Sequence, residues 1–147
     1  MINRHNHLNL EAIPGNYQYD ALNRKGAIQG QWHKNRHNLI SFLQFLQKND
    51  KLLDAGCGSG NVILEFAGHV DYALGIDNNP ACIQFLTKQL ENKHINNANA
   101  RVMDLVRLEL KGKQFTKVIM TEILEHFSEE EGKKVLEQIK SILTPNG

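Results

Sequence analysis

The sequence is poor in cysteine and has no long apolar run. These two absences exclude several classes of protein. Its two cysteines, Cys57 and Cys82, are too few for a disulfide framework or a zinc pattern, so we expect reduced thiols in a cytoplasmic protein. No apolar run approaches the ~20 residues that span a bilayer, and the first residues contain no apolar segment of a secretory signal. The net charge of +1 favours neither a nucleic-acid nor a membrane partner. A length of 147 residues indicates one globular domain.

Short apolar strands alternate with amphipathic helices from residue 51 onward. Such alternation predicts a parallel sheet with helices on both faces, and right-handed crossovers make it a Rossmann-like, doubly wound α/β fold with strand order 3-2-1-4. Asn79-Pro80 opens one helix, with asparagine as its N-cap, and a capping box of Ser128 and Glu131 opens the last. The expected strands span residues 51–55, 72–77, 100–104 and 115–121.

The N-terminal third has a different pattern. Residues 1–27 are polar and weakly periodic, as in an irregular arm. From Trp32 to Leu46 the apolar residues recur at helical spacing, and Asn49-Asp50 ends this stretch. We therefore divide the chain into an arm and cap helix, residues 1–49, and a core, residues 50–147.

The stretch LLDAGCGSGN, residues 52–61, predicts a ligand-binding loop after the first strand. Its glycines, at alternate positions, let the backbone turn sharply and approach a ligand closely. In the dinucleotide pattern G-x-G-x-x-G the third glycine would fall at residue 61, which is Asn61. Asp54, just before the loop, is poorly placed beside a pyrophosphate and suits a cationic ligand instead.

Asp77 ends the second strand, 23 residues after Asp54. Ligands of such sheets bind beyond the carboxyl ends of the strands, where an acid can accept hydrogen bonds from both hydroxyls of a ribose. Asp is also common in turns, so Asp77 alone is weak evidence for a ribose site. It indicates such a site because the glycine loop precedes it at the expected spacing.

In order and spacing, four segments of residues 50–147 resemble the motifs of class I S-adenosylmethionine-dependent methyltransferases. The last segment is most similar to the small-molecule branch that includes ubiquinone-biosynthesis O-methyltransferases. The N-terminal stretch resembles the cap of those enzymes more loosely. The matching segments are LLDAGCGSGN, ALGIDNNP, ARVMDL and VIMTEILEHF with the final LTPNG.

This resemblance implies S-adenosylmethionine as cofactor, S-adenosylhomocysteine as product, and a role for each loop. The glycine-loop backbone would contact the methionine portion, with Asp54 near its ammonium group. Asp77 would hold the ribose hydroxyls, Asp104 would accept from the adenine amine, and Thr121 would lie against the methionine portion. The cofactor-binding residues expected on this basis are Arg36, Asp54, Gly56, Cys57, Gly58, Gly60, Asp77, Asn78, Met103, Asp104, Leu105 and Thr121.

His126 is the candidate general base for a hydroxyl acceptor, because it follows the fourth strand on the substrate side. A histidine that merely supports this loop is the competing interpretation. Glu122, Glu125 and His126 also resemble the metal ligands of RNA 2′-O-methyltransferases. Those enzymes use a further histidine downstream, which has no counterpart here, and the charge does not favour RNA, so we expect no metal.

The last residues, LTPNG, fall where the resemblance places the turn before strand five, so strands five to seven would be missing. The fourth strand would then be an open edge, able to pair with a second copy in a homodimer. We favour the other interpretation, that the chain is a fragment of a longer enzyme. We expect a methyltransferase, or its cofactor-binding portion, that acts on a small-molecule acceptor. The alternatives are the metal-dependent RNA enzyme and a non-catalytic S-adenosylmethionine-binding module that associates through its open edge.

Overall fold

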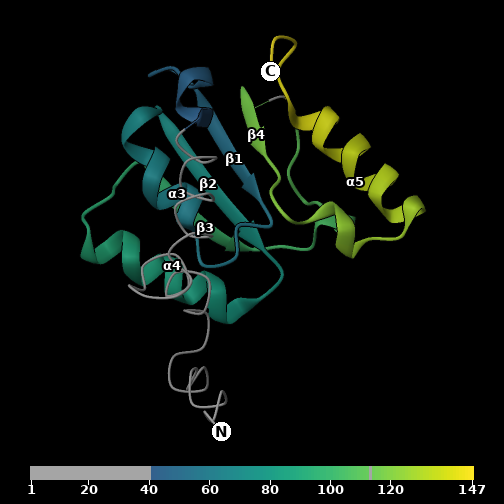
Figure 1. Ribbon diagram of the computed structural model, residues 1–147, viewed down its shortest axis with the longest axis horizontal. Helices are drawn as coiled ribbons and strands as arrows, with labels where there is room; N and C mark the ends of the chain where they lie inside the picture. The colour runs from purple at the N-terminus through teal and green to yellow at the C-terminus, as the bar shows by residue number, and fades with distance from the viewer. Residues whose placement is uncertain (1–40, 113) are drawn as a thin grey trace, which may run out of the picture.

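The computed structural model describes residues 41–112 and 114–147, and the core in it is a four-stranded parallel sheet (Figure 1). The strand order is β3-β2-β1-β4, with every neighbouring pair parallel, which confirms the predicted Rossmann-like fold. The strands are β1 (Lys51–Ala55), β2 (Tyr72–Asp77), β3 (Ala98–Val102) and β4 (Lys117–Ile119).

Helices cover both faces of the sheet, as Figure 1 shows. One face packs against α3 (Asn61–Phe66) and α4 (Pro80–Asn92), and the other packs against α5 (Glu129–Ile142). No helix of the described ranges is both long and apolar enough to cross a membrane. Short 3-10 helices complete the described elements: η2 (Leu43–Phe45), η3 (Ala67–His69), η4 (Leu105–Arg107) and η5 (Leu124–His126).

Alternation along β1 directs its side chains to the two faces in turn. Leu52 packs on the α3 and α4 side, whereas Leu53 and Ala55 pack on the α5 side. Asp54 therefore shares the face of Leu52, opposite Gly75 of β2 in the register. An acid thus occupies a position in the strand that would otherwise hold a core side chain.

Two strands differ from their predicted bounds. β3 begins at residue 98 and ends at residue 102, two residues earlier than expected, so Met103 and Asp104 lie in the loop after it. β4 covers only residues 117–119 of the expected 115–121. Its predicted first residue, Phe115, forms a parallel bridge with Leu143 beyond α5, so the chain ahead of β4 pairs partly with the C-terminal segment.

The predicted cap helix lies mostly outside the described residues, as does Arg36. Its described end stops at Phe45 rather than at Asn49-Asp50, because Leu46 takes up an extended conformation. Residues 47–50 form a turn closed by hydrogen bonds in both directions between Gln47 and Asp50. Leu43 and Leu46 pack against the α3 and α4 side of the core, as their helical spacing predicted. The division at residue 49 stays a prediction.

Both predicted helix starts are confirmed. The Asn79 side chain accepts a hydrogen bond from the Ala81 N–H at 3.0 Å, and Pro80 occupies the first turn of α4. At α5, the Ser128 Oγ accepts from the Glu131 N–H, and the Glu131 carboxylate accepts from the Ser128 N–H at 3.0 Å.

Loss of this capping box should measurably destabilise the protein. We expect Ser128→Ala to lower the free energy of unfolding by about 1 kcal/mol, because the first turn of α5 loses an acceptor. Urea unfolding followed by circular dichroism measures the change. Ser141→Ala, in an exposed position near the end of the same helix, is the matched control and should cost less than about 0.5 kcal/mol. Equal costs for the two variants would contradict the role of the cap.

Candidate functional site

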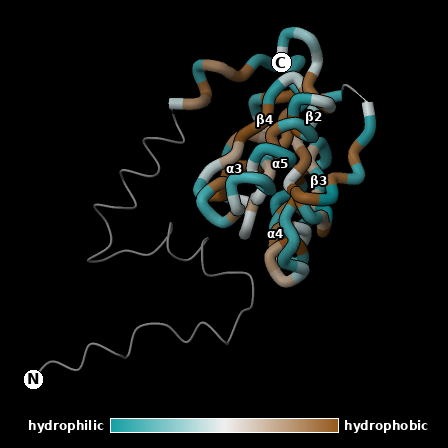
Figure 2. Tube along the Cα trace, turned by 90° about the vertical axis from the view of Figure 1, so that its right-hand side faces the viewer, coloured by the Kyte–Doolittle hydropathy of each residue, from teal (hydrophilic) through white to brown (hydrophobic). Residues whose placement is uncertain are grey.

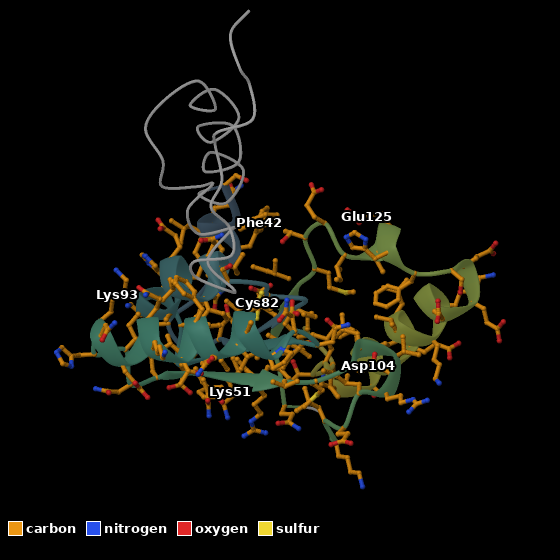
Figure 3. All side chains as sticks on the ribbon, turned by 90° about the horizontal axis from the view of Figure 1, so that it is seen from below. Phe42, Lys51, Cys82, Lys93, Asp104 and Glu125 are labelled. Atoms are coloured by element: carbon orange, nitrogen blue, oxygen red, sulfur yellow. The ribbon has the colours of Figure 1, made fainter. Side chains whose placement is uncertain are left out.

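Four loops meet at one edge of the sheet, because the carboxyl ends of parallel strands lie together. They comprise residues 56–60 after β1, 78–79 after β2, 103–104 after β3 and 120–123 after β4. The predicted site residues of the described ranges lie in these loops or in the strand ends that lead into them, apart from Leu105 and His126 in η4 and η5. Figure 3 labels Cys82 near the middle of the molecule, and Asp104 and Glu125 nearer to α5.

The glycine loop is fastened to the end of β2. The N–H groups of Gly56 and Cys57 both donate to the Ile76 carbonyl, at 2.8 and 2.9 Å, and the Gly60 N–H donates to the Cys57 carbonyl at 2.8 Å. Gly60 has a left-handed φ of 82° and immediately precedes α3. The bonds and the left-handed backbone together give the loop one defined shape.

A side chain from the β4 loop closes over the glycine loop. A Cβ built at Gly56 would lie 2.7 Å from the Ile123 Cγ1 atom, which is closer than real Cβ contacts come. This close approach and the left-handed φ of 83° at Gly56 together favour glycine at this position. Sequence reasoning missed Ile123, since nothing in the local pattern shows which residue packs over a glycine.

Asp77 is held in a fixed orientation at the end of β2. Its Oδ2 atom accepts from the Gly58 N–H at 2.8 Å, and its Oδ1 atom accepts from the Asn79 N–H at 2.8 Å. A carboxylate has about four acceptor positions, so two remain for the hydroxyls of a ligand. Asn78 is exposed beside it. The bond to Gly58 joins this acid directly to the glycine loop.

Asp54 is buried behind the loop, with only 1% of its surface exposed. Within residues 41–112 and 114–147, neither of its carboxylate oxygens has a hydrogen-bond partner. Burial raises the pKa of this carboxyl to about 8, and the nearby Asp77 carboxylate adds to the rise. A buried polar group without a partner is rare in native proteins and points to an interaction made by something else.

Both cysteines are free thiols on this side of the sheet. The Cys57 Sγ donates to the Gly58 carbonyl at 3.6 Å. Burial is the main cause that raises the pKa of both thiols, and the Asp77 carboxylate adds to it. The thiolate form is therefore disfavoured, so neither cysteine is suited to act as a nucleophile. Cys57 instead contributes a small side chain to the wall of the loop.

The loop after β3 is joined to the same strand end. The Met103 N–H donates to the Asp77 carbonyl at 2.9 Å, and Met103 is half-buried. Asp104 is exposed and caps η4 by accepting from the Val106 N–H at 2.8 Å. Leu105 differs from the expectation that it would line the site, because its side chain packs in the core on the α5 side. Only its backbone remains available to a ligand.

The loop after β4 contains Thr121, which is half-buried, and Glu122, which has a left-handed φ of 53°. Such a conformation is uncommon for a residue other than glycine and tends to occur at functional sites. His126 is exposed at the end of η5. Glu122, Glu125 and His126 do not converge: in the described part of the chain, no three His, Cys, Asp or Glu side chains come together as a metal site. The metal-dependent RNA alternative gains no support from this geometry.

Comparison with known proteins matches residues 52–147 to the model of a family described as a methyltransferase domain. A probable cobalt-precorrin-6B C(15)-methyltransferase of Methanothermobacter thermautotrophicus is 43% identical over 53 residues, which is 36% of this chain and 28% of that protein. PKMT2 from Rickettsia typhi, solved in complex with AdoHcy, is 30% identical with a TM-score of 0.62, over 68% of this chain and 20% of that one. The YcgJ protein from Bacillus subtilis is 19% identical with a TM-score of 0.70, over 76% of this chain and 48% of that one, and supports the fold alone.

The matched region thus spans less than half the length of each of these three proteins. The family match itself covers most of this chain and includes all four loops of the site. The chain therefore belongs to the methyltransferase domain family, and its methyl donor is S-adenosylmethionine.

Proposed function

We propose that this chain is the cofactor-binding portion of an enzyme that transfers a methyl group to a small-molecule acceptor, on an oxygen, nitrogen or carbon atom. A place near the ubiquinone-biosynthesis O-methyltransferases is part of the proposal and rests on the similarity of the TEILEHF segment. The observation that carries the cofactor assignment is the buried Asp54 carboxylate, unpartnered within the described residues, directly behind the glycine loop. A cationic group that enters the loop would satisfy it.

The residues present fit the cofactor. In this proposal Asp54 interacts with the α-ammonium group, the glycine-loop backbone contacts the methionine portion, and Asp77 accepts from both ribose hydroxyls. Asp104 uses one oxygen to cap η4 and keeps the other for the adenine amine. Gly60, Cys57, Asn78, Met103 and Thr121 form the surrounding walls.

The main contribution of the protein to methyl transfer is to position the acceptor. The bound cofactor supplies a methyl group already activated by its sulfonium centre, so the site mainly orients the acceptor in line with that group. We assign His126 as the general base for a hydroxyl acceptor, since its exposed imidazole lies past β4 in η5, directly after the loop that closes over Gly56.

Removal of the Asp77 carboxylate should weaken cofactor binding. We expect Asp77→Ala to raise the dissociation constant for S-adenosylmethionine about 10- to 100-fold, because two charge-assisted hydrogen bonds to the ribose are lost. Calorimetric titration with S-adenosylmethionine and S-adenosylhomocysteine measures the change. Asp71→Ala, in an exposed position just before β2, is the matched control and should bind as the wild type does. An unchanged affinity in Asp77→Ala would refute the ribose role, and no binding by the wild type at millimolar cofactor would refute the cofactor assignment.

A second candidate function, association through the open edge, is favoured by a groove beside β4. In the described sheet β4 pairs with β1 on one side only. A groove of about 540 Å³ runs along its other side, between η2 and α5. Figure 2 shows the segment around η2 beside the C-terminal turn, and residues of both segments line this groove. Three of its lining side chains are large, apolar and exposed: Phe45, Leu124 and Leu136.

We propose a second copy of the chain as the occupant, since an edge strand can pair with its own counterpart about a two-fold axis. Sedimentation of the wild type should then give a dimer, and Leu136→Lys should give a monomer. Val102→Lys is the matched control, because Val102 is also exposed and apolar but lies on β3, at the opposite edge of the sheet. A monomeric wild type, or dissociation by Val102→Lys alone, would exclude this interface.

A further inference from the structure

Asp54 holds an unusual position among the buried polar groups of the described residues. Its two carboxylate oxygens are the buried side-chain polar atoms that lack a hydrogen-bond partner there. A buried carboxylate is ordinarily stabilised by backbone N–H groups, by a cation or by a hydroxyl. Whether Asp54 is ionised therefore depends on which donors lie close to it.

The glycine loop, the nearest source of backbone donors, uses the N–H groups of four of its residues elsewhere. Those of Gly56 and Cys57 donate to the Ile76 carbonyl, that of Gly58 donates to Asp77, and that of Gly60 donates to the Cys57 carbonyl. A helix N-terminus follows the loop, but none of these four bonds reaches Asp54. The loop thus leaves the carboxylate without the stabilisation that the start of a helix often gives.

No cation of the described residues compensates the charge. From β2, the end residue Asp77 faces Asp54 with a like charge. The loop and α4 contribute the buried thiols of Cys57 and Cys82, whereas Lys88 and Glu91 of α4 are exposed. Neighbouring strand positions are Gly75 and Ile119, which carry no charge, and α3 contributes apolar side chains. Burial and the like charge both favour the protonated acid and raise its pKa to about 8.

We propose that Asp54 carries a proton in the ligand-free protein and releases it to solvent when the α-ammonium group of the cofactor binds. In this step the Asp54 O–H bond breaks, the proton passes to the buffer, and the ammonium group keeps its three protons and pairs with the new carboxylate. The inference rests on the proposed function, because it takes S-adenosylmethionine as the ligand. It adds that binding is linked to pH: below about pH 8 the affinity should rise nearly tenfold for each unit of pH.

Calorimetric titration of the wild-type chain tests the linkage. Binding of S-adenosylmethionine is measured at about pH 6.5 in buffers of different ionisation enthalpy, where the α-amino group of the ligand remains protonated. The dependence of the observed enthalpy on the buffer gives the number of protons exchanged. We expect close to one proton released with S-adenosylmethionine and also with S-adenosylhomocysteine, which keeps the ammonium group. Methylthioadenosine, which lacks it, should bind without proton release.

Two variants identify the residue that releases the proton. Asp54→Asn should bind more weakly and release none, whereas Asp71→Asn, a surface control, should release as many as the wild type. Binding of S-adenosylmethionine without proton release would overturn the inference and leave the cofactor assignment intact. Release by Asp54→Asn, release with methylthioadenosine, or release with S-adenosylmethionine but not with S-adenosylhomocysteine would also overturn it. Failure of the wild type to bind S-adenosylmethionine at all would overturn both proposals.

Discussion

Replacing Gly60 with alanine is expected to lower the free energy of unfolding by about 2–5 kcal/mol. Gly60 has a φ of 82°, and a left-handed conformation costs an L-residue about 1–2 kcal/mol. The new methyl group would also overlap the side chain of Leu86, which is fully buried on α4. Inserting a carbon atom into a packed core typically costs a further 1–3 kcal/mol or so. Urea unfolding at constant pH measures the total.

Two further variants separate a local clash from a general effect of added bulk. Gly68→Ala places the same methyl group where nothing lies within 4 Å, so its effect should stay within about 0.5 kcal/mol. Leu86→Ala removes the side chain that Gly60→Ala would strike, although it creates a cavity of its own. The double variant should therefore be more stable than the sum of the two single effects by about 1 kcal/mol or more. Simple additivity would show that Leu86 does not limit the size of residue 60.

The second large effect is expected from Asp54→Asn in the ligand-free protein. The pKa of Asp54 rises from an ordinary value of 3.8 to about 8 on folding, so the folded state binds more protons than the unfolded state between these limits. The free energy of unfolding of the wild type must then fall as the pH rises from about 4 to about 8. Asparagine cannot ionise, and the variant should lose this part of the dependence.

We therefore compare the free energies of unfolding of Asp54→Asn and of the wild type at pH 5 and at pH 8. The difference between the two proteins should shift in favour of the variant by at least about 2 kcal/mol over this range. The free-energy cost of burying the asparagine amide is the same at both pH values. It therefore cancels when the two pH values are compared, and only the effect of ionisation remains. Thermal unfolding at a series of pH values gives the two profiles. Asp71→Asn should follow the wild type throughout. Parallel profiles for Asp54→Asn and the wild type would contradict the raised pKa of Asp54.

Local signals in the sequence predicted the features that depend on a few neighbouring residues. Asn79 and Ser128 were identified as helix caps because capping requires particular side chains one to three residues from the helix start. β1 and β2 were predicted with their observed bounds, since each ends at an acid or a glycine loop. The bounds of β4 depend on the bridge between Phe115 and Leu143, 28 residues apart in sequence (143 minus 115), which a local pattern cannot contain.

The same distinction applies to the site. The parallel fold itself brings Asp54, Asp77 and Asp104 to one edge of the sheet, so their order along the chain sufficed to group them. The environment of each acid was not predictable. Asp77 is held by backbone donors from two loops, whereas Asp54, one strand away, has none among the described residues. That contrast arises from where the N–H groups of the glycine loop point after folding.

The bonds between the glycine loop, the β3 loop and the end of β2 have a consequence for binding energetics. Gly56 and Cys57 are attached to Ile76, Gly58 to the Asp77 side chain, and Met103 to the Asp77 carbonyl. The proposed cofactor-binding surface is thereby ordered when the chain folds, and little conformational entropy remains to be lost when a ligand binds. Preorganisation of this kind should appear as an association rate for the cofactor that changes little when osmolyte is added at constant viscosity.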